Sequence, residues 1–156
     1  MPTLSSQSMV ILMADDDNDD RLLATETLAE SGAAGELHVF EDGERLLEYL
    51  QKTSAGLPPR PCIILLDLNM PKLGGKEVLE ALRKDPRLKH IPVIILSTSH
   101  APQDINSLYD AGAHSYITKP ASFDGLVALM QGLAAYWSQV TKVSDLSVGM
   151  AVGVEV

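Results

Sequence analysis

Acidic, hydroxyl and basic side chains in this sequence come directly after runs of apolar residues. The groups that follow these runs are Asp15-Asp16-Asp17, Asp67-Leu68-Asn69, Ser97-Thr98 and Thr118-Lys119-Pro120. If each run is a strand of one parallel sheet, the groups meet outside the carboxyl ends of the strands. The sequence therefore predicts a single rim that carries carboxylates, hydroxyls and an ammonium group.

Carboxylates from two neighbouring strands repel each other, by about 4 kcal/mol per pair at about 4 Å and an effective dielectric constant near 20. A divalent cation with oxygen ligands would offset this repulsion. Mg²⁺ fits best, because it accepts one or two carboxylates and keeps waters and phosphate oxygens as its other ligands. An Asp between Mg²⁺ and a lysine is an ionised nucleophile suited to forming an aspartyl phosphate. We assign that role to Asp67, with Lys119 as the cation and Ser97 as a hydrogen-bond donor to a phosphoryl oxygen.

The elements that must position these residues are predicted from hydrophobic periodicity. Short runs rich in Val, Ile and Leu alternate with segments of helical periodicity, which indicates five βα units around a parallel sheet. The expected strands are Met9 to Ala14, Glu36 to Phe40, Cys62 to Asp67, Pro92 to Ser97 and His114 to Thr118. The expected helices are Asp19 to Ser31, Glu44 to Thr53, Lys76 to Lys84, Gln103 to Ala111 and Ser122 to Trp137. The fold class is thus α/β with element order (βα)5.

The domain is expected to cover residues 9–137, and residues 138–156 to form a tail. Near the end of the chain Val148, Met150, Val152, Val154 and Val156 alternate with other residues, which is strand periodicity. The tail is therefore expected to be either disordered or an added edge strand or arm on a partner chain.

Composition limits the possible partners. The 156 residues carry a formal net charge of -9 without a compensating run of Lys and Arg, so nucleic acid is not an expected partner. No apolar run approaches the roughly 20 residues that a membrane span needs, so no membrane partner is expected. The first residues lack the pattern of a secretory signal, and Cys62 is the single cysteine. The expected compartment is the cytoplasm.

The sequence resembles the receiver domains of two-component response regulators over roughly Met9 to Trp137. The motifs that carry the resemblance are ILMADDD, CIILLDLNMP, PVIILSTS and YITKP. The resemblance implies a flavodoxin-like, doubly wound parallel sheet with strand order 2-1-3-4-5. It also implies that Asp15 and Asp16 bind Mg²⁺, that Asp67 is the phosphoacceptor and also a metal ligand, and that the backbone carbonyl of Asn69 completes the metal site.

Further roles at the rim follow from the same resemblance. Ser97, with Thr98 beside it, matches the switch hydroxyl, and Lys119 matches the lysine that contacts the phosphoryl group. Pro120 matches a cis proline, and Tyr116 matches the aromatic residue that rotates on activation. The chain would then be a phosphoacceptor switch, with at most slow self-phosphorylation from small donors and slow self-dephosphorylation, and not a metabolic enzyme.

A narrower resemblance is to single-domain regulators paired with bacterial and cyanobacterial phytochrome kinases. The segments DLNMPKLGGKEVL, HIPVIILSTS and DINSLYDAGAHSYITKP carry it. It implies a histidine kinase, possibly of phytochrome type, as phosphoryl donor, and a downstream protein or phosphotransfer partner as output. One departure is Gly74-Gly75, where the family usually has a polar residue before glycine.

Parts of the sequence also match two other kinds of functional site. Asp15, Asp17, Asp19 and Glu26 occupy four positions of a calcium-loop pattern, but its glycine position holds Asp20 and a strand precedes it. The Asp67-Leu68-Asn69 segment also resembles the nucleophile motif of aspartate-dependent phosphatases, but it lacks the second acidic residue that acts as acid and base. Turnover of a generic phosphate ester would favour the phosphatase.

The last helix carries more apolar surface than one contact with a sheet needs. Beside the line expected to face the sheet, a second line is formed by Leu129, Leu133, Tyr136 and Val140. An exposed apolar line usually marks an interface, and a twofold dimer is the commonest closed assembly. The sequence therefore predicts a homodimer through this second line.

Overall fold

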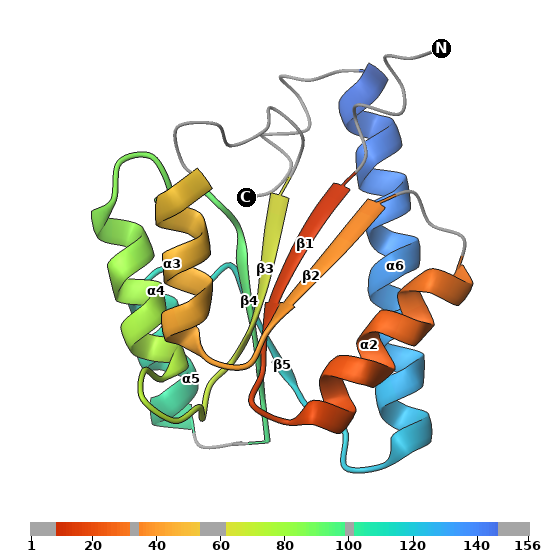
Figure 1. Cartoon of the computed structure of the whole chain (residues 1–156), viewed down its shortest axis with the longest axis horizontal. Helices are drawn as coiled ribbons and strands as arrows, with labels where there is room; N and C mark the ends of the chain where they lie inside the picture. The colour runs from red at the N-terminus through yellow and green to blue at the C-terminus, as the bar shows by residue number, and fades with distance from the viewer. Residues whose placement is uncertain (1–8, 32–34, 54–61, 99–101, 147–156) are drawn as a thin grey trace.

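The protein is a five-stranded parallel sheet with helices on both faces (Figure 1). The computed structural model describes residues 9–31, 35–53, 62–98 and 102–146. The strands are β1 (Met9–Ala14), β2 (Gly35–Phe40), β3 (Cys62–Asp67), β4 (Val93–Ser97) and β5 (Ser115–Thr118). The helices are α2 (Asn18–Ser31), α3 (Gly43–Thr53), α4 (Gly75–Lys84), α5 (Pro102–Asp110) and α6 (Phe123–Leu146). The sheet order β2-β1-β3-β4-β5 confirms the doubly wound, flavodoxin-like fold.

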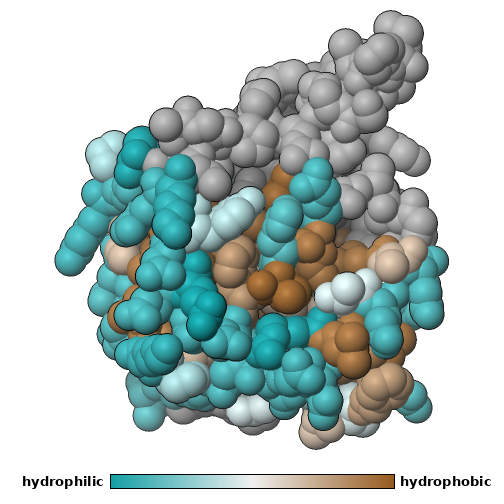
Figure 2. Space-filling model, viewed as in Figure 1, coloured by the Kyte–Doolittle hydropathy of each residue, from teal (hydrophilic) through white to brown (hydrophobic). Residues whose placement is uncertain are grey.

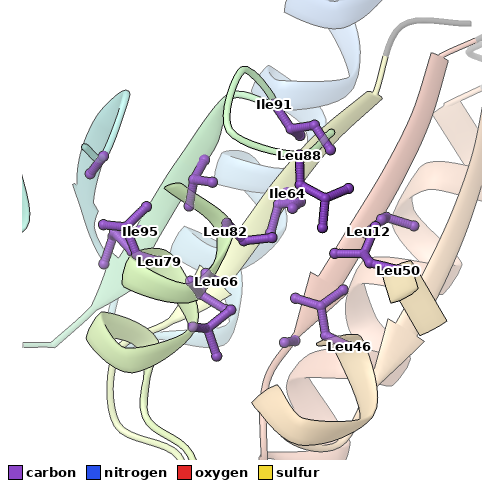
Figure 3. Packing of buried hydrophobic residues seen from close by; sticks show 14 of the residues in the cluster. Leu12, Leu46, Leu50, Ile64, Leu66, Leu79, Leu82, Leu88, Ile91 and Ile95 are labelled. Atoms are coloured by element: carbon purple, nitrogen blue, oxygen red, sulfur yellow. The ribbon is translucent and has the colours of Figure 1, made fainter. Parts of the chain in front are cut away.

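Alternate residues of each strand enter two separate cores. Leu12, Ile64 and Ile95 point to the face covered by α3, α4 and α5, where they pack with leucines of α3 and α4 (Figure 3). Ile11 and Ile63 point to the face covered by α2 and α6. Because both faces are covered, β1 is apolar throughout, and β3 and β4 are apolar up to their last residues, Asp67 and Ser97, as buried parallel strands are.

On the face of the molecule shown in Figure 2, the described residues are mostly hydrophilic. Hydrophobic side chains gather in the middle of the face shown there, between the hydrophilic surfaces of the helices. A pocket of about 410 Å³ lies beside the edge strand β2, lined by residues of β2, α2 and α3 that include Phe40, Arg45 and Tyr49. None of the predicted site residues lines this pocket. Within the described ranges, no helix is long and apolar enough to span a membrane.

The last helix differs from its prediction. It continues beyond Trp137 to Leu146, so the first part of the expected tail is helical. The sequence offers no Gly or Pro between Trp137 and Leu146, and the first glycine is Gly149, so nothing in this stretch ends the helix. Residues 147–156, with their strand-like alternation, lie outside the described residues.

The second apolar line of this helix is also partly covered. Leu133 is only 9% exposed and belongs to the core, and Leu129 is half-buried against the same core. The prediction of an exposed interface residue is therefore wrong for Leu133, while Leu129 keeps part of its surface exposed. The reason is that α6 packs against both α2 and β1, so more of its surface is buried than the single line of residues expected to face the sheet. The side chains of Tyr136 and Val140 lie outside the described residues.

Candidate functional site

Three carboxylates meet at the carboxyl ends of the two central strands. Asp15 and Asp16 follow β1, and Asp67 is the last residue of β3, which pairs directly with β1. One oxygen from each of the three carboxylates lies within 4.8 Å of the others. Asp15 is fully buried, Asp67 is 8% exposed and Asp16 is exposed, so the cluster opens to solvent on the side of Asp16.

Hydrogen bonds within the connection from β1 to α2 hold this cluster in place. The backbone N–H of Asp17 donates to Oδ1 of Asp15 over 2.9 Å. Asp17 in turn accepts from the backbone N–H groups of Asp19 and Asp20, at 2.8 and 3.2 Å, and so caps the start of α2. Asp17 is therefore a capping residue. Of the three consecutive aspartates, Asp15 and Asp16 thus belong to the acidic cluster, whereas Asp17 caps α2.

Lys119 supplies the positive charge of the rim. Its Nζ lies 2.7 Å from Oδ2 of Asp15, 2.8 Å from Oδ2 of Asp20 and 4.0 Å from Oδ1 of Asp67. Its backbone N–H donates to the carbonyl of Ser97 over 2.7 Å, which ties the end of β5 to the end of β4. Lys119 therefore brings its ammonium group close to both Asp15 and the phosphoacceptor candidate.

Burial and charge shift the pKa values of these groups in different directions. Burial, followed by the negative charge of Asp15, raises the pKa of Asp67 to about 7, against the opposing effect of Lys119. Burial also raises the pKa of Asp15, although the hydrogen bond from Lys119 lowers it. For Lys119, burial alone would lower the pKa, but hydrogen bonds to Asp15 and Asp20 raise it above its ordinary value. A bound cation would stabilise the ionised forms of Asp15 and Asp67, which burial and, to a smaller extent, neighbouring negative charge disfavour.

The chain matches a known family across most of its length. The profile of the response regulator receiver domain matches residues 11–131. The chain belongs to this family. Receivers are the phosphoacceptor switches of two-component signalling, so this chain is a response regulator of a two-component system.

Relatives of this receiver include phytochrome response regulators. Response regulator Rcp1 of Synechocystis sp. is 37% identical over 134 residues, which are 85% of this chain and 91% of Rcp1. The crystal structure of the Mn²⁺-bound form of Rcp1 has a TM-score of 0.73 at 38% identity, covering 82% of this chain and 93% of that one. The phosphorylated cyanobacterial phytochrome response regulator RcpA has a TM-score of 0.75 at 39% identity, covering 83% and 94%. The narrower resemblance is thereby confirmed.

The remaining predicted residues of the receiver lie around the same rim. Ser97 is buried at the end of β4, beside Asp67 at the end of β3, and Thr98 after it is exposed. Asn69 is exposed, two residues after Asp67. Tyr116 is half-buried on β5 against the core, and its backbone N–H donates to the hydroxyl of Tyr109 over 3.1 Å.

The expected cis proline is wrong. Among the described residues no peptide bond is cis, so the bond before Pro120 is trans. Trans is the more stable isomer of an X–Pro bond by about 0.5–1 kcal/mol.

Sequence reasoning missed two residues of this site. Asp20, in the first turn of α2, is a direct partner of Lys119. Arg21 donates from Nη1 to the carbonyl of Asp15 over 2.7 Å and so braces the turn that carries the acidic pair. Asp20 belongs to the acidic run after β1, and the first turn of α2 starts at the same rim. This acidic run is the sequence signal that could have identified Asp20 as a residue of the site.

The residues present fit a divalent cation. Three carboxylates with hard oxygen donors converge in a partly open site, which suits a cation that keeps several of its waters. Lys119 can neutralise part of their charge, but it lies closest to Asp15 and Asp20 and leaves Asp16 without its contact. The site of this receiver can therefore hold a divalent metal ion through Asp15, Asp16 and Asp67.

Proposed function

We propose that Asp67 accepts a phosphoryl group from a phosphohistidine of a histidine kinase, with Mg²⁺ held by Asp15, Asp16, Asp67 and the carbonyl of Asn69. The observation that supports this most is the position of Asp67. It lies at the end of the central strand, where it forms the carboxylate cluster with the acidic pair, and its Oδ1 is 4.0 Å from Nζ of Lys119. Negative charge added at Asp67 would therefore be stabilised by Lys119 and by a cation bound at the carboxylates.

In the proposed step, a carboxylate oxygen of Asp67 attacks phosphorus. The bond from phosphorus to the histidine nitrogen of the kinase breaks, and the nitrogen keeps the electron pair. Asp15 and Asp20 orient Lys119 toward Asp67 and toward the oxygens of the incoming phosphoryl group. When bound, Mg²⁺ neutralises charge on the carboxylates and the phosphoryl oxygens.

The product is a switch and not a step in catalytic turnover. A phosphoryl group adds a charge of about −1.5 to −2. This charge would draw the Ser97 hydroxyl and Lys119 toward Asp67, and the change at the ends of β4 and β5, with Tyr116 on β5, would alter the binding surface. A downstream protein or a phosphotransfer partner would recognise that change. The homodimer stays a prediction, and Tyr136 and Val140 would carry its interface.

A phosphotransfer profile tests the proposed kinase. Histidine kinases labelled on histidine, one of phytochrome type and one from a chemotaxis system, are each mixed with the receiver and sampled over seconds to minutes. We expect faster transfer from the phytochrome-type kinase in Mg²⁺ and no transfer in excess chelator. Equal rates from both kinases would contradict the proposed partner, and turnover of a generic phosphate ester would contradict the switch.

Removal of the exposed carboxylate of the acidic cluster should weaken Mg²⁺ binding. For Asp16→Asn we expect the affinity to fall roughly tenfold, because one charged oxygen ligand is worth on the order of 1.4 kcal/mol. Asp19→Asn is the matched control, since it removes one exposed carboxylate from the same segment but lies outside the cluster. Amide shifts followed during Mg²⁺ titration measure both. Equal affinities of the two variants would show that the cation binds elsewhere.

A further inference from the structure

A buried carboxylate lies at the turn between β2 and α3, outside the acidic cluster. Asp42 is 3% exposed, and its Oδ1 accepts from the backbone N–H of Arg45 over 2.9 Å at the start of α3. A helix cap needs an acceptor but no charge, and Asn or Ser would serve as well. Burying a charge is costly unless it is paired. The charge of Asp42 therefore needs a reason beyond the cap.

The partner of that charge comes from the loop that follows the phosphoacceptor. Nζ of Lys72 lies 3.7 Å from Oδ2 of Asp42, and Nε of Arg45 lies 3.9 Å from the same oxygen. Arg45 has a closer partner, since its Nε lies 3.0 Å from Oε1 of Glu41. Lys72 is thus the cation that links Asp42 to residues 68–74, the β3–α4 loop, which contains Asn69.

The backbone at Lys72 has a conformation that residues other than glycine rarely adopt. Its φ is 65°, in the left-handed region that glycine adopts without cost and other residues adopt rarely. Beside it, the N–H of Leu73 donates to the carbonyl of Pro71 over 2.7 Å, which closes a tight turn. A lysine in this conformation costs free energy that a glycine would not, and what it adds is an ammonium group within reach of Asp42.

The two connections also touch through their backbones. A Cβ on Gly43 would collide with Cγ2 of Val78 and lie 2.8 Å from the carbonyl oxygen of Leu73. At the other end of the loop, a Cβ on Gly75 would lie 2.7 Å from the carbonyl oxygen of Asp67. The β3–α4 loop is therefore packed between the turn after β2 and the end of β3, at the same edge of the sheet as the acidic cluster (Figure 1).

We propose that Asp42 and Lys72 are positioning residues for the phosphoacceptor site. Their ion pair holds the β3–α4 loop against the turn after β2 and so fixes the position of Asn69, whose carbonyl is the proposed ligand of the metal held by Asp15, Asp16 and Asp67. The inference rests on the proposed function and adds to it two residues that touch neither metal nor phosphoryl group. Through this ion pair, the turn after β2 affects the affinity of the site for its cation.

The sign of the effect separates positioning from simple electrostatics. Lys72 is a cation near an acidic site, so losing its charge alone should tighten Mg²⁺ binding slightly. Losing a positioning contact should weaken Mg²⁺ binding instead. Lys72→Asn is the sharpest variant, because asparagine tolerates the left-handed conformation and carries no charge. Asp42→Asn keeps the cap acceptor and removes the charge.

The experiment measures Mg²⁺ affinity and the rate of labelling by acetyl phosphate in Lys72→Asn, Asp42→Asn and the double variant. Lys76→Gln is the control, because it removes one exposed cation from the start of α4. We expect each single variant to lose about two- to fivefold in Mg²⁺ affinity, as a half-exposed ion pair allows. The double variant should lose no more than either single one, and the control should bind as tightly as the parent or slightly tighter.

Unchanged or tighter Mg²⁺ binding by Lys72→Asn would overturn the inference, and so would additive losses in the double variant. A merely structural role would lower the midpoint of urea unfolding without changing Mg²⁺ affinity in the folded protein, and that result would also overturn it. The proposed function fails separately, if the parent protein is not labelled at Asp67. The two failures are therefore distinguishable in the same set of samples.

Discussion

Asp67→Asn is expected to stabilise the metal-free protein by about 2 to 4 kcal/mol at about pH 8. The folded chain raises the pKa of Asp67 from 3.8 to about 7, chiefly through burial and then through the charge of Asp15. Ionising Asp67 in the folded state is therefore costly, and asparagine removes this cost while keeping a similar shape. Urea unfolding of parent and variant in the presence of chelator measures the difference.

The pH dependence of this difference has a definite sign. Between 3.8 and about 7 the folded state holds a proton on Asp67 that the unfolded state has already released. The parent therefore loses stability relative to the variant as pH rises through this window, and the gap stays constant above it. At about pH 4 the two proteins should unfold at nearly the same urea concentration.

The control for this prediction is Glu80→Gln, which removes one exposed carboxylate from α4 and changes the net charge equally. It should change stability by less than about 0.5 kcal/mol at either pH. Saturating Mg²⁺ should stabilise the parent more than Asp67→Asn, because the cation is bound by the carboxylate that the variant lacks. A variant less stable than the parent in chelator at about pH 8 would contradict the electrostatic account of the rim.

Lys119→Met is expected to destabilise the metal-free protein by about 3 kcal/mol or more at about pH 8. Nζ of Lys119 pairs with Asp15 at 2.7 Å and with Asp20 at 2.8 Å, and Asp15 has no exposed surface. Removing only the cation leaves a buried carboxylate unpaired, which costs more than the ion pair contributes. Methionine keeps the length and most of the packing volume of the stem. Urea unfolding again measures the loss.

The matched control for this variant is Lys84→Met, at an exposed position of α4. It removes the same charge and should shift the unfolding midpoint little. The loss in Lys119→Met should also shrink toward about pH 4, because the unpaired carboxylates can then take up protons. A loss as small as that of the control would mean that the contacts of Lys119 do not hold the rim together.

The fold could be predicted from the sequence because its signal is local and repeated. β1, β3 and β4 are short apolar runs buried on both faces, and such strands occur almost only in sheets covered by helices on both sides. Once the strands are parallel, their carboxyl ends must share a rim, so Asp15, Asp16, Asp67 and Lys119 could be brought together from sequence alone.

Other features could not be predicted because they depend on contacts between distant elements. The pairing of Asp20 with Lys119 requires the orientation of α2 relative to β5, which periodicity does not supply. The burial of Leu133 and the partial burial of Leu129 depend on α2, which packs on α6 in addition to the sheet. The ion pair of Lys72 with Asp42 depends on the positive φ of Lys72, which no neighbouring residue in the sequence predicts.

The central claim is that Asp67 is the phosphoacceptor, and intact-mass measurement after incubation with acetyl phosphate and Mg²⁺ tests it most directly. The parent protein should gain the mass of one phosphoryl group, and it should lose this gain in excess chelator. Asp67→Asn, which is expected to fold at least as well, should gain none, while the Glu80→Gln control should behave as the parent. Stoichiometric labelling of Asp67→Asn would contradict the account, and so would a peptide map that places the phosphoryl group of the parent on another residue.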